Sequence, residues 1–497
     1  MAGVAALVAV PFLFPFVAGP STNALQLLAS WFCAALLIAC NGPLFSSRSH
    51  SWDAGLAWGL LCAGLCSAAL GLLQYYGLAD ALAPWTTQPE LGQAYGNLRQ
   101  RNQFASMISM SFIAALWLYA AKDDGSRRLR AGLLAPSLGL LLLGAAASTS
   151  RTGLLQLIGI SGAGAFIAWR ERRGNGDIGN GNLLPHPLWL LALLPAYFAA
   201  AWLVPWLASP GVEDMIHRLR HGAPDDHSRL VLWRNVLELI AVHPWAGWGW
   251  GELSYAHYTM RYPGPRFVEI LDNAHNLPLH LAVELGIPAA VLIFGGFAWL
   301  VLSARPWRER EPTRLMAWGL LAVIVLHSLL EYPLWYGPFQ LVFGLCLALL
   351  WPARALAFPV WARTAMATVL IAACGYAAWD YARISQLYLP REERLAVWRD
   401  DTLVKAKRSW LFADEVRFAE LSLTPVTRAN AAAMYDLARR TLHFSPEPRV
   451  IVKLIDSAVL LGHDDEALAQ AERFRRAFPA DYARWLKGQS VEAPPAP

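Results

Sequence analysis

The sequence predicts an all-α membrane protein, and two observations support that prediction. The first is composition: 56% of the 497 residues are hydrophobic and 15% are charged, whereas a soluble domain carries about 25% charged residues. The second is that apolar runs long enough to cross a hydrocarbon layer of about 30 Å recur along most of the chain. We therefore expect a polytopic bundle of about eleven membrane helices.

The eleven apolar runs are the expected membrane spans. They are Gly3–Gly19, Asn23–Cys40, Ala54–Leu73, Phe104–Ala121, Ala131–Ala147, Gly153–Trp169, Leu188–Leu207, Leu277–Leu302, Leu315–Leu330, Leu334–Trp351 and Phe358–Trp379. The first run has no basic leader segment and no clear cleavage site, so we interpret it as a retained span. All six cysteines fall inside these runs, which favours small buried hydrophobes over a disulfide framework.

Basic residues cluster in alternate short loops between the spans. The clusters lie near Arg48, at 122–130, at 170–173, at 305–314 and near Arg354. The positive-inside rule makes these loops cytoplasmic. The N-terminus is then cytoplasmic, whereas a large loop at 208–276 and the tail after Trp379 lie on the opposite side. The net charge of +5 is small for this length and does not suggest binding to nucleic acid.

The chain after Trp379 has a different character. Its charges are dense and nearly balanced, and its apolar residues recur at helical spacing. Segments Ala431–Phe444 and Asp465–Phe478 are predicted to be short amphipathic helices packed in pairs, in a tetratricopeptide-like arrangement. We expect two domains: a transmembrane domain at 1–379, and a C-terminal helical domain at 380–497 that binds or packs rather than catalyses.

Two polar clusters at the non-cytoplasmic span ends contain arginines. Arg99, Arg101, Asn102 and Gln103 directly precede a span, and they form either a donor-rich cradle for an anionic head group or an interfacial stretch anchored to lipid phosphates. Arg151 lies in the short Ser148–Gly153 turn without a nearby acid. A phosphate would supply its partner through bidentate hydrogen bonds, although a lipid phosphate would serve equally.

Two further clusters lie in and after the large loop. Ser228 is a predicted helix N-cap, which places Arg229 in the first turn, where the helix dipole adds to its positive field. A salt bridge to the preceding aspartates is the alternative. Trp248 and Trp250 alternate with glycines, which predicts a flexible aromatic element that stacks on sugars, or else residues of an interfacial belt.

His275 lies between Asn273 and Asn276, where the large loop re-enters an apolar helix. A titratable imidazole at a membrane mouth suits proton transfer. His280 and Glu284 follow Asn276 on one helical face. His327 and Glu331 likewise share one helical face, just before Tyr332. For Glu284 and His327 we favour a structural hydrogen bond between helices. No metal-binding or nucleotide-binding motif is present in the sequence, so we expect neither a metal nor a cofactor.

These motifs resemble those of bacterial O-oligosaccharyltransferases related to pilin glycosylation enzymes, within the superfamily of O-antigen ligases and polymerases. The resemblance covers roughly residues 92–351 and rests on the segments 96–103, 150–153, 228–247, 273–286 and 327–334. It implies a bacterial inner-membrane enzyme whose site faces the periplasm. The implied reaction moves a preassembled glycan from undecaprenyl pyrophosphate to a serine or threonine of a periplasmic protein such as a pilin.

Roles for the polar residues follow from that resemblance and from their chemistry. We expect His275 to be the general base and Arg151 and Arg229 to stabilise the pyrophosphate leaving group, with Asn273 or Asn276 orienting the imidazole. The expected substrate-binding residues are Arg99, Arg101, Asn102, Gln103, Asn273, Asn276, Glu331, Tyr332, Trp248 and Trp250. An O-antigen ligase acting on lipid A core, an O-antigen polymerase and a transporter or flippase are the alternatives. A transporter is disfavoured because no internal repeat is evident.

Overall fold

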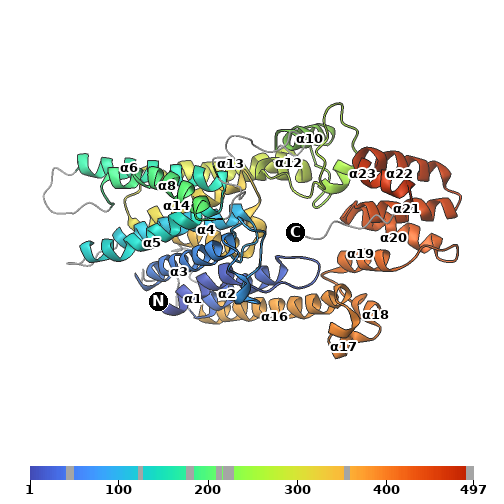
Figure 1. Cartoon of the computed structure of the whole chain (residues 1–497), viewed down its shortest axis with the longest axis horizontal. Helices are drawn as coiled ribbons and strands as arrows, with labels where there is room; N and C mark the ends of the chain where they lie inside the picture. Colours follow the sequence, from blue (N-terminus) through green and yellow to red (C-terminus); the bar gives the residue numbers. More distant parts are fainter. Residues whose placement is uncertain are drawn as a thin grey trace. The chain divides into compact units, whose positions relative to one another are not determined.

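The computed structural model describes residues 1–40, 50–120, 127–174, 184–208, 215, 229–351 and 359–488. Every regular element within these ranges is a helix, so the predicted all-α class is confirmed (Figure 1). The chain divides into two compact units. Unit 1 comprises Met1–Val17, Thr22–Gly222 and Val301–Gly375, and unit 2 comprises Ala18–Ser21, Ala223–Leu300 and Tyr376–Pro497. The domain boundary expected near residue 380 stays a prediction.

Unit 1 is a bundle of apolar helices. Its described elements are α1 (Ala2–Leu13), α2 (Ala24–Cys40), α3 (His50–Tyr75), η1 (Asp80–Leu82), α4 (Arg101–Ala120), α5 (Arg127–Ala147), α6 (Arg151–Gly174), α7 (Pro187–Leu191), α8 (Leu193–Trp206), η3 (Pro306–Arg308), α14 (Pro312–Ser328), η4 (Pro333–Trp335) and α15 (Gly337–Leu350). The boundary between the two units falls within α13 (Ile287–Ala304) and again within α16 (Val360–Ser385).

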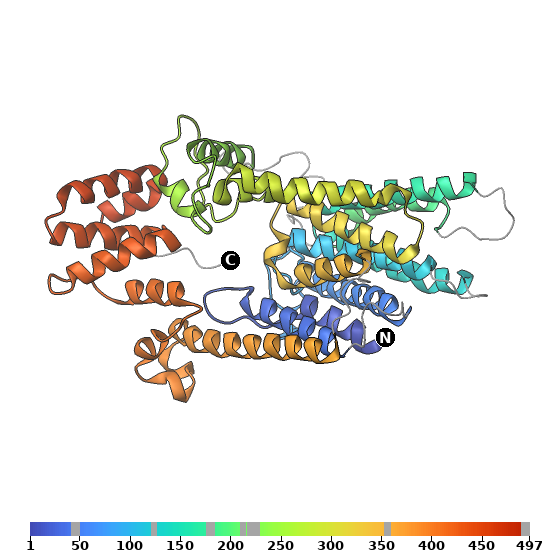
Figure 2. The ribbon, with the colours of Figure 1, turned by 180° about the vertical axis from the view of Figure 1, so that it is seen from behind.

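Helix α4 is the centre of unit 1. It contacts α3, α5, α6 and α14, and 89% of its most apolar stretch is buried. Figure 2 shows this bundle from behind. Small residues let its neighbours come close, since a Cβ on Gly64 of α3 would lie 1.9 Å from the Ser111 hydroxyl of α4. Such close contacts between small residues are typical of helix packing in membranes, where lipid offers no hydrophobic drive.

The apolar helices make this a multi-pass membrane protein. Within the described residues, six helices are long and apolar enough to cross a bilayer by length and composition, and five more are apolar but shorter. Only 6% of the most apolar stretch of α13, and likewise of α16, is buried within the protein, as expected of spans that face lipid. The predicted number of eleven spans stays a prediction.

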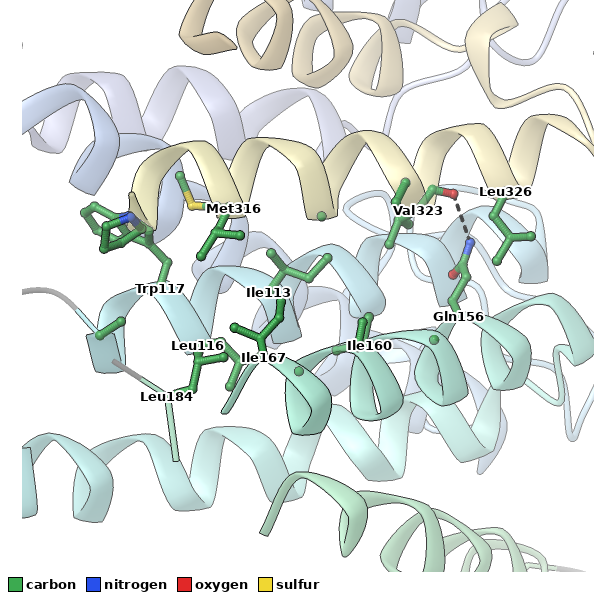
Figure 3. A pocket seen from close by; sticks show the side chains of 18 residues that line it. Ile113, Leu116, Trp117, Gln156, Ile160, Ile167, Leu184, Met316, Val323 and Leu326 are labelled. Carbon is green, nitrogen blue, oxygen red and sulfur yellow. Dashed lines mark hydrogen bonds between the residues drawn. The ribbon is translucent and has the colours of Figure 1, made fainter. Parts of the chain in front are cut away.

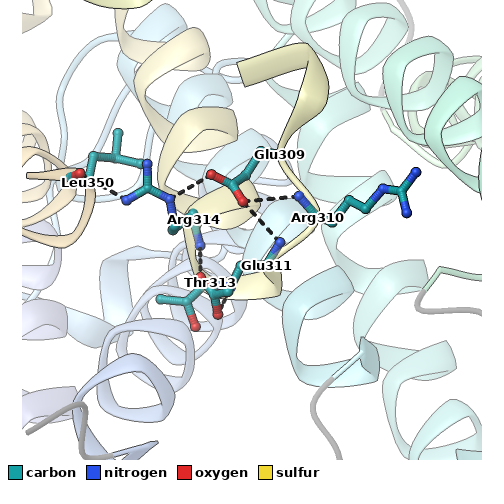
Figure 4. A network of polar contacts seen from close by, with 6 residues as sticks. All are labelled: Glu309, Arg310, Glu311, Thr313, Arg314 and Leu350. Atoms are coloured by element: carbon teal, nitrogen blue, oxygen red, sulfur yellow. Dashed lines mark hydrogen bonds and ion pairs between the residues drawn. The ribbon is translucent and has the colours of Figure 1, made fainter. Parts of the chain in front are cut away.

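Glutamates organise the start of α14. The Glu311 carboxylate accepts hydrogen bonds from the main-chain N–H groups of Thr313 and Arg314, at 3.1 and 2.8 Å. The Arg314 guanidinium in turn donates to Glu309 and to the carbonyl of Leu350 (Figure 4). Glu311 thus satisfies N–H groups that a helix start leaves without partners. The bond from Arg314 to Leu350 attaches this basic loop to the end of α15.

Unit 2 combines the described part of the large loop with the tail. Its loop elements are α10 (Arg229–Val242), α11 (Leu253–Thr259) and α12 (Leu277–Leu285). Its tail elements are η6 (Gln386–Tyr388), η7 (Arg391–Glu393), α17 (Ala396–Arg399), α18 (Thr402–Ala406), α19 (Ala413–Leu423), α20 (Ala431–Phe444), α21 (Pro448–Leu460), α22 (Asp464–Ala477) and α23 (Pro479–Leu486). Helices α20 and α22 match the two predicted amphipathic segments within one residue; the tetratricopeptide-like arrangement stays a prediction.

Helix α11 of the large loop packs on the tail inside unit 2. The Tyr258 hydroxyl donates to the Gln470 side chain at 2.9 Å, and the Tyr255 ring stacks on His443 with centroids 3.8 Å apart. The tail therefore supports a loop element that immediately follows the tryptophan–glycine segment.

The predicted span Leu277–Leu302 is wrong as a single helix. Gly286, at φ +88°, ends α12, and α13 starts at Ile287. Pro288 lacks an N–H group and its ring disfavours a preceding helical turn, whereas it fits the first turn of α13, where no such N–H is needed. His280 and Glu284 consequently lie on a separate short helix that precedes the long apolar one.

Candidate functional site

In unit 1, helices α4 and α6 run parallel and begin side by side. The Ser150 hydroxyl donates to the Asn102 side-chain oxygen at 2.6 Å, at the start of both helices. One turn further on, the Gln156 amide donates to the Ser106 hydroxyl at 2.8 Å. Side chains cap one N–H group in each first turn, since Gln103 N–H donates to Gln100 and Gly153 N–H donates to Ser150. Two helix N-termini thus lie together, and their dipoles add in one region.

Arg101 and Arg151 are the first residues of these two helices. Arg151 is exposed and Arg101 is partly exposed. Within the described part of the chain neither guanidinium forms a hydrogen bond or an ion pair. Arginine beside a helix N-terminus attracts anions through both its charge and its donors. The arrangement therefore suits a phosphate-bearing ligand, in line with the prediction for Arg151.

Arg99 has a different environment from its neighbour Arg101. Its guanidinium donates to the main-chain carbonyls of Thr22, at 3.2 Å, and Pro15, at 2.5 Å. Partial burial lowers the pKa of the guanidinium from its usual value, and the residue has a left-handed backbone with φ +57°. Arg99 thus clamps main chain within unit 1, which favours a structural role for this predicted substrate-binding residue.

Asn102 also connects to a buried carboxylate. Its amide nitrogen donates to Glu331 at 3.1 Å, and Glu331 is only 5% exposed. Tyr332 stacks on Tyr336 with centroids 5.9 Å apart. The Gln103 side chain is buried beside this network, and its carbonyl oxygen has no hydrogen-bond partner among the described residues. The structure thus brings Asn102, Ser150 and Glu331 together.

His327 is a buried residue of α14 whose ring nitrogen Nδ1 lies 2.9 Å from the Ser106 hydroxyl of α4. This contact is the interhelical hydrogen bond that we favoured for His327. It continues through Ser106 to Gln156, a polar residue inside an apolar span that our sequence reasoning missed. A polar side chain at such a depth is itself a signal.

In unit 2, α10 begins at Arg229, as predicted. Ser228, the predicted N-cap, lies outside the described residues. Trp233 of the same helix donates its indole N–H to the Ala274 carbonyl at 3.1 Å. Helix α10 thereby holds the residue that directly precedes His275.

His275 lies in a left-handed turn with φ +48°. Its main-chain N–H donates to the Asn273 side chain at 2.9 Å, and Asn276 caps α12 by accepting from Leu279 N–H at 3.1 Å. The side chain of His275 is partly exposed. The two asparagines thus set the main chain on either side of the imidazole, which is consistent with a presented, partly solvated base.

The tryptophan–glycine segment is anchored rather than flexible, contrary to our expectation. Trp248 N–H donates to the Val283 carbonyl and Gly249 N–H to the Glu284 carbonyl, at 2.8 and 3.0 Å. The Trp248 indole donates to the Leu239 carbonyl, whereas Trp250 is 62% exposed. Of the two predicted sugar-stacking residues, Trp250 has the accessible ring face.

His280 and Glu284 pair with each other on α12. His280 Nε2 and Glu284 Oε2 are 3.6 Å apart, and the Glu284 carboxylate also accepts from the main-chain N–H groups of Gly251 and Leu253. Both residues are at most 3% exposed. The contact with His280 lies within one helix, whereas the bond from Leu253, the first residue of α11, joins two helices, which is the kind of contact that we favoured for Glu284.

His257 is a buried histidine that sequence reasoning missed. Its Nε2–H donates to the Phe267 carbonyl at 3.1 Å, and Nδ1 accepts from the Tyr262 hydroxyl at 2.8 Å; a carbonyl only accepts, which sets this tautomer. Burial, with a smaller contribution from the Arg266 charge, lowers the pKa of His257 to about 3. The ring is therefore neutral and structural. Within the described ranges, no three acidic, cysteine or histidine side chains converge to hold a metal.

Comparisons with known families cover every predicted site residue. A family described as O-antigen ligase matches residues 136–294. A family described as virulence factor membrane-bound polymerase, C-terminal, matches 315–491, and a protein glycosylation ligase family matches 94–119. The last match contains Arg99 to Gln103, and the first contains Arg151, Arg229 and His275.

One similar protein is a general O-oligosaccharyltransferase of Acinetobacter baylyi. It is 23% identical over 308 residues, which is 59% of this chain and 49% of that protein. The chain thus matches about half the length of this curated relative. The roles of the individual site residues stay predictions.

Proposed function

Because this chain belongs to the O-antigen ligase superfamily, with features of its protein-glycosylating branch, we propose that it is an O-linked oligosaccharyltransferase of the bacterial inner membrane. Its donor is a preassembled glycan on undecaprenyl pyrophosphate, and its acceptor is a serine or threonine of a periplasmic protein such as a pilin. The reaction needs no metal or nucleotide.

The observation that carries the proposal is the pair of adjoining N-termini of α4 and α6, with Arg101 and Arg151 as their first residues. Two helix dipoles and two guanidinium groups provide a field that a pyrophosphate neutralises. Breaking the bond between the sugar and the pyrophosphate leaves an anion, so stabilising that anion lowers the barrier. Arg229 at the start of α10 is assigned the same task.

His275 supplies the base on this proposal. An imidazole ring nitrogen with a free lone pair can accept a proton from a hydroxyl group. The acceptor hydroxyl oxygen attacks the anomeric carbon as its proton passes to His275, while the bond to the pyrophosphate oxygen breaks. One carbon–oxygen bond forms and one breaks, so a direct displacement inverts the anomeric configuration. Trp250 offers an exposed ring for a sugar of the glycan.

A second function is worth testing because the C-terminal part of the chain, residues 315–491, matches a family described as virulence factor membrane-bound polymerase, C-terminal. An O-antigen polymerase would pass the glycan to a second lipid-linked glycan, and an O-antigen ligase would pass it to lipid A core. The leaving-group chemistry is shared by all three, and only the acceptor differs.

The test is co-expression with a glycan locus and a pilin in cells that lack their own ligase. Glycan on the pilin supports the proposal, whereas glycan on lipid A core or longer lipid-linked glycans would replace it with an alternative. His275→Ala should reduce transfer by about 10²–10⁴-fold while the protein remains in the membrane. His463→Ala, an exposed histidine of unit 2, is the matched control.

Arg151→Lys separates pyrophosphate binding from simple charge. A lysine keeps the charge but loses the bidentate geometry, so transfer should fall by about 10²-fold if the guanidinium stabilises the leaving group. Activity equal to the unmodified protein would instead make Arg151 a lipid anchor. Membrane levels of the variant, measured by immunoblot, exclude loss of protein as the cause.

A further inference from the structure

In unit 2 the chain that follows α16 folds back along that helix. The Asp380 carboxylate of α16 accepts hydrogen bonds from the Ser409 hydroxyl, at 2.9 Å, and from the Leu411 N–H, at 3.3 Å. Asp380 is buried and also pairs with Arg383. Residues 391–411, which we call the return segment, thus come back to the last turns of α16. Figure 1 shows α17 and α18, which belong to this segment, at the end of α16.

The hydrocarbon boundary at this end of α16 lies close to Trp379. No charged residue lies between Arg363 and Asp380 in the sequence. The stretch from Val360 to Trp379 is about 29 Å long at 1.5 Å per residue, which matches a hydrocarbon layer of about 30 Å. Tyr376 and Trp379 are both exposed, and their rings lie 5.9 Å apart. Because tyrosine and tryptophan are enriched where lipid meets water, this pair indicates the level at which α16 leaves the membrane.

Trp410 of the return segment lies at the same level. Its ring centroid is 6.4 Å from that of Tyr376. Tyr376 precedes Ser385, the last residue of α16, by about 14 Å along the helix axis, so the chain has returned by several turns. The Trp410 side chain is nevertheless 75% exposed. An exposed indole beside a lipid-facing helix, at the boundary of the hydrocarbon layer, is placed to contact lipid.

Exposed apolar side chains continue into α17 and α18. Leu395, Val397 and Val404 are 56%, 73% and 62% exposed. The two helices are joined, since the Lys405 ammonium donates to the Val397 carbonyl at 2.9 Å. Exposed groups of large apolar side chains mark contact with another apolar surface. Charge contributes little to the choice of that surface, because the return segment has six basic and four acidic residues.

We propose that the return segment is a membrane-surface anchor, in which Trp410 and Val397 insert among the phospholipid acyl chains of the leaflet that α16 reaches at Trp379. Amphipathic segments of this kind lie in the plane of the interface with their apolar side chains below the head groups. The occupant is lipid rather than protein, because the exposed apolar side chains adjoin the lipid-facing surface of α16.

The anchor has a consequence for the tail. The return segment connects α16 to the amphipathic helices α19 to α23, so its contact with the bilayer fixes how far those helices stand from the membrane surface. The tail is then attached to the membrane at the return segment as well as through α16. This attachment is independent of the proposed glycan transfer.

Photocrosslinking at three positions tests the anchor. The photoreactive residue p-benzoyl-phenylalanine replaces Val397, Trp410 or Leu468 in the full-length protein. Leu468 of α22 is the matched control, because it is 70% exposed but lies outside the return segment. All three side chains are exposed, so the replacements leave the core packing intact. Each protein is illuminated in phosphatidylethanolamine–phosphatidylglycerol vesicles, and its phospholipid adducts are quantified by mass spectrometry.

We expect phospholipid adducts at the Val397 and Trp410 positions to exceed those at Leu468 by roughly tenfold or more, since burial of a large apolar side chain favours the inserted state by at least that factor. The adducts should persist in phosphatidylcholine vesicles and in about 1 M NaCl, because insertion does not depend on charge. Adducts at Val397 no more frequent than at Leu468 would overturn the proposal. Crosslinks from Val397 to a second copy or to another protein, in place of lipid, would overturn it in favour of a protein interface.

Discussion

The polar cluster of unit 1 and the His275 segment of unit 2 are held in place by different means. At the start of α4 and α6, side chains bond to one another across helices, as Asn102 does with Ser150 and Glu331. Around His275, side chains bond mainly to the main chain, as Asn273 and Asn276 do. The first arrangement depends on helix packing and the second on the path of the backbone.

This difference predicts which substitutions damage each region. Loss of one side chain in unit 1 removes individual hydrogen bonds, so the effects should be graded. In unit 2 the backbone itself must fit, because the 244–248 turn packs against the end of α12 with main chain against main chain. Substitutions at its closely packed glycines should therefore have the largest effects.

The largest expected effect on folding is that of Gly286→Ala. A Cβ at Gly286 would lie 2.2 Å from the Trp245 carbonyl oxygen, and φ is +88°, so clash and backbone strain together should cost about 3 kcal/mol or more. The measurement is the urea midpoint for proteolysis of the solubilised full-length protein. Gly251→Ala is the control, since φ there is +82° but nothing lies within 4 Å, and its cost should be about 1 kcal/mol. Equal losses of stability in the two variants would mean that the close contact between Gly286 and Trp245 does not add to the cost.

The next effect is a pH dependence that originates at His257. Its pKa is about 3 in the folded protein against 6.5 for the free group, so the unfolded chain takes up the proton first as the pH falls. The stability is fully present above pH 6.5 and is lost toward pH 3, with about 2 kcal/mol lost by pH 5. The proteolysis midpoint across this range should flatten in His257→Gln and keep its slope in His463→Gln. A slope unchanged by His257→Gln would show that another group is responsible.

The smallest effects compare one asparagine from each region. Asn102→Ala removes a donor to Glu331 and an acceptor for Ser150, at a cost of about 1–2 kcal/mol. Asn276→Ala removes one helix cap, at a cost of about 1 kcal/mol. Asn102→Asp keeps the acceptor for Ser150 but places a second carboxyl group beside the buried Glu331, so it should be at least as costly as Asn102→Ala. If Asn102→Asp proved as stable as the unmodified protein, the contact with Glu331 would contribute nothing.

Part of the site could be predicted because its signals are local. Arg229 begins a helix as expected, since helix starts are marked by polar residues ahead of apolar runs. Arg151 also begins a helix, although we expected it in the turn that precedes the span. The break at Gly286 also had a local signal, a glycine two residues before Pro288, which the continuous hydropathy of the run obscured.

Other site features had no local signal. Arg99 and Arg101 lie in one motif and look equivalent in the sequence. The Arg99 guanidinium nevertheless donates hydrogen bonds to main-chain carbonyls of residues far earlier in the chain. Nothing near His257 in the sequence indicated that both ring nitrogens would be bonded in a dry core. Likewise an apolar groove in unit 1 is formed jointly by α4, α6 and α14 (Figure 3), and the sequence of any one helix does not predict it.

The sequence by itself determined that the chain is helical and largely apolar, where many of its helices begin, and which charged residues stand at their ends. Helix formation and lipid solubility depend on neighbours within a few turns, so a linear pattern is enough to read them. Only the tertiary structure decided that α4 and α6 start together, that Arg101 and Arg151 stay available while Arg99 does not, and that an apolar groove forms between α4, α6 and α14. Those outcomes depend on which side chains meet across residues far apart in the chain, and packing alone brings them into contact.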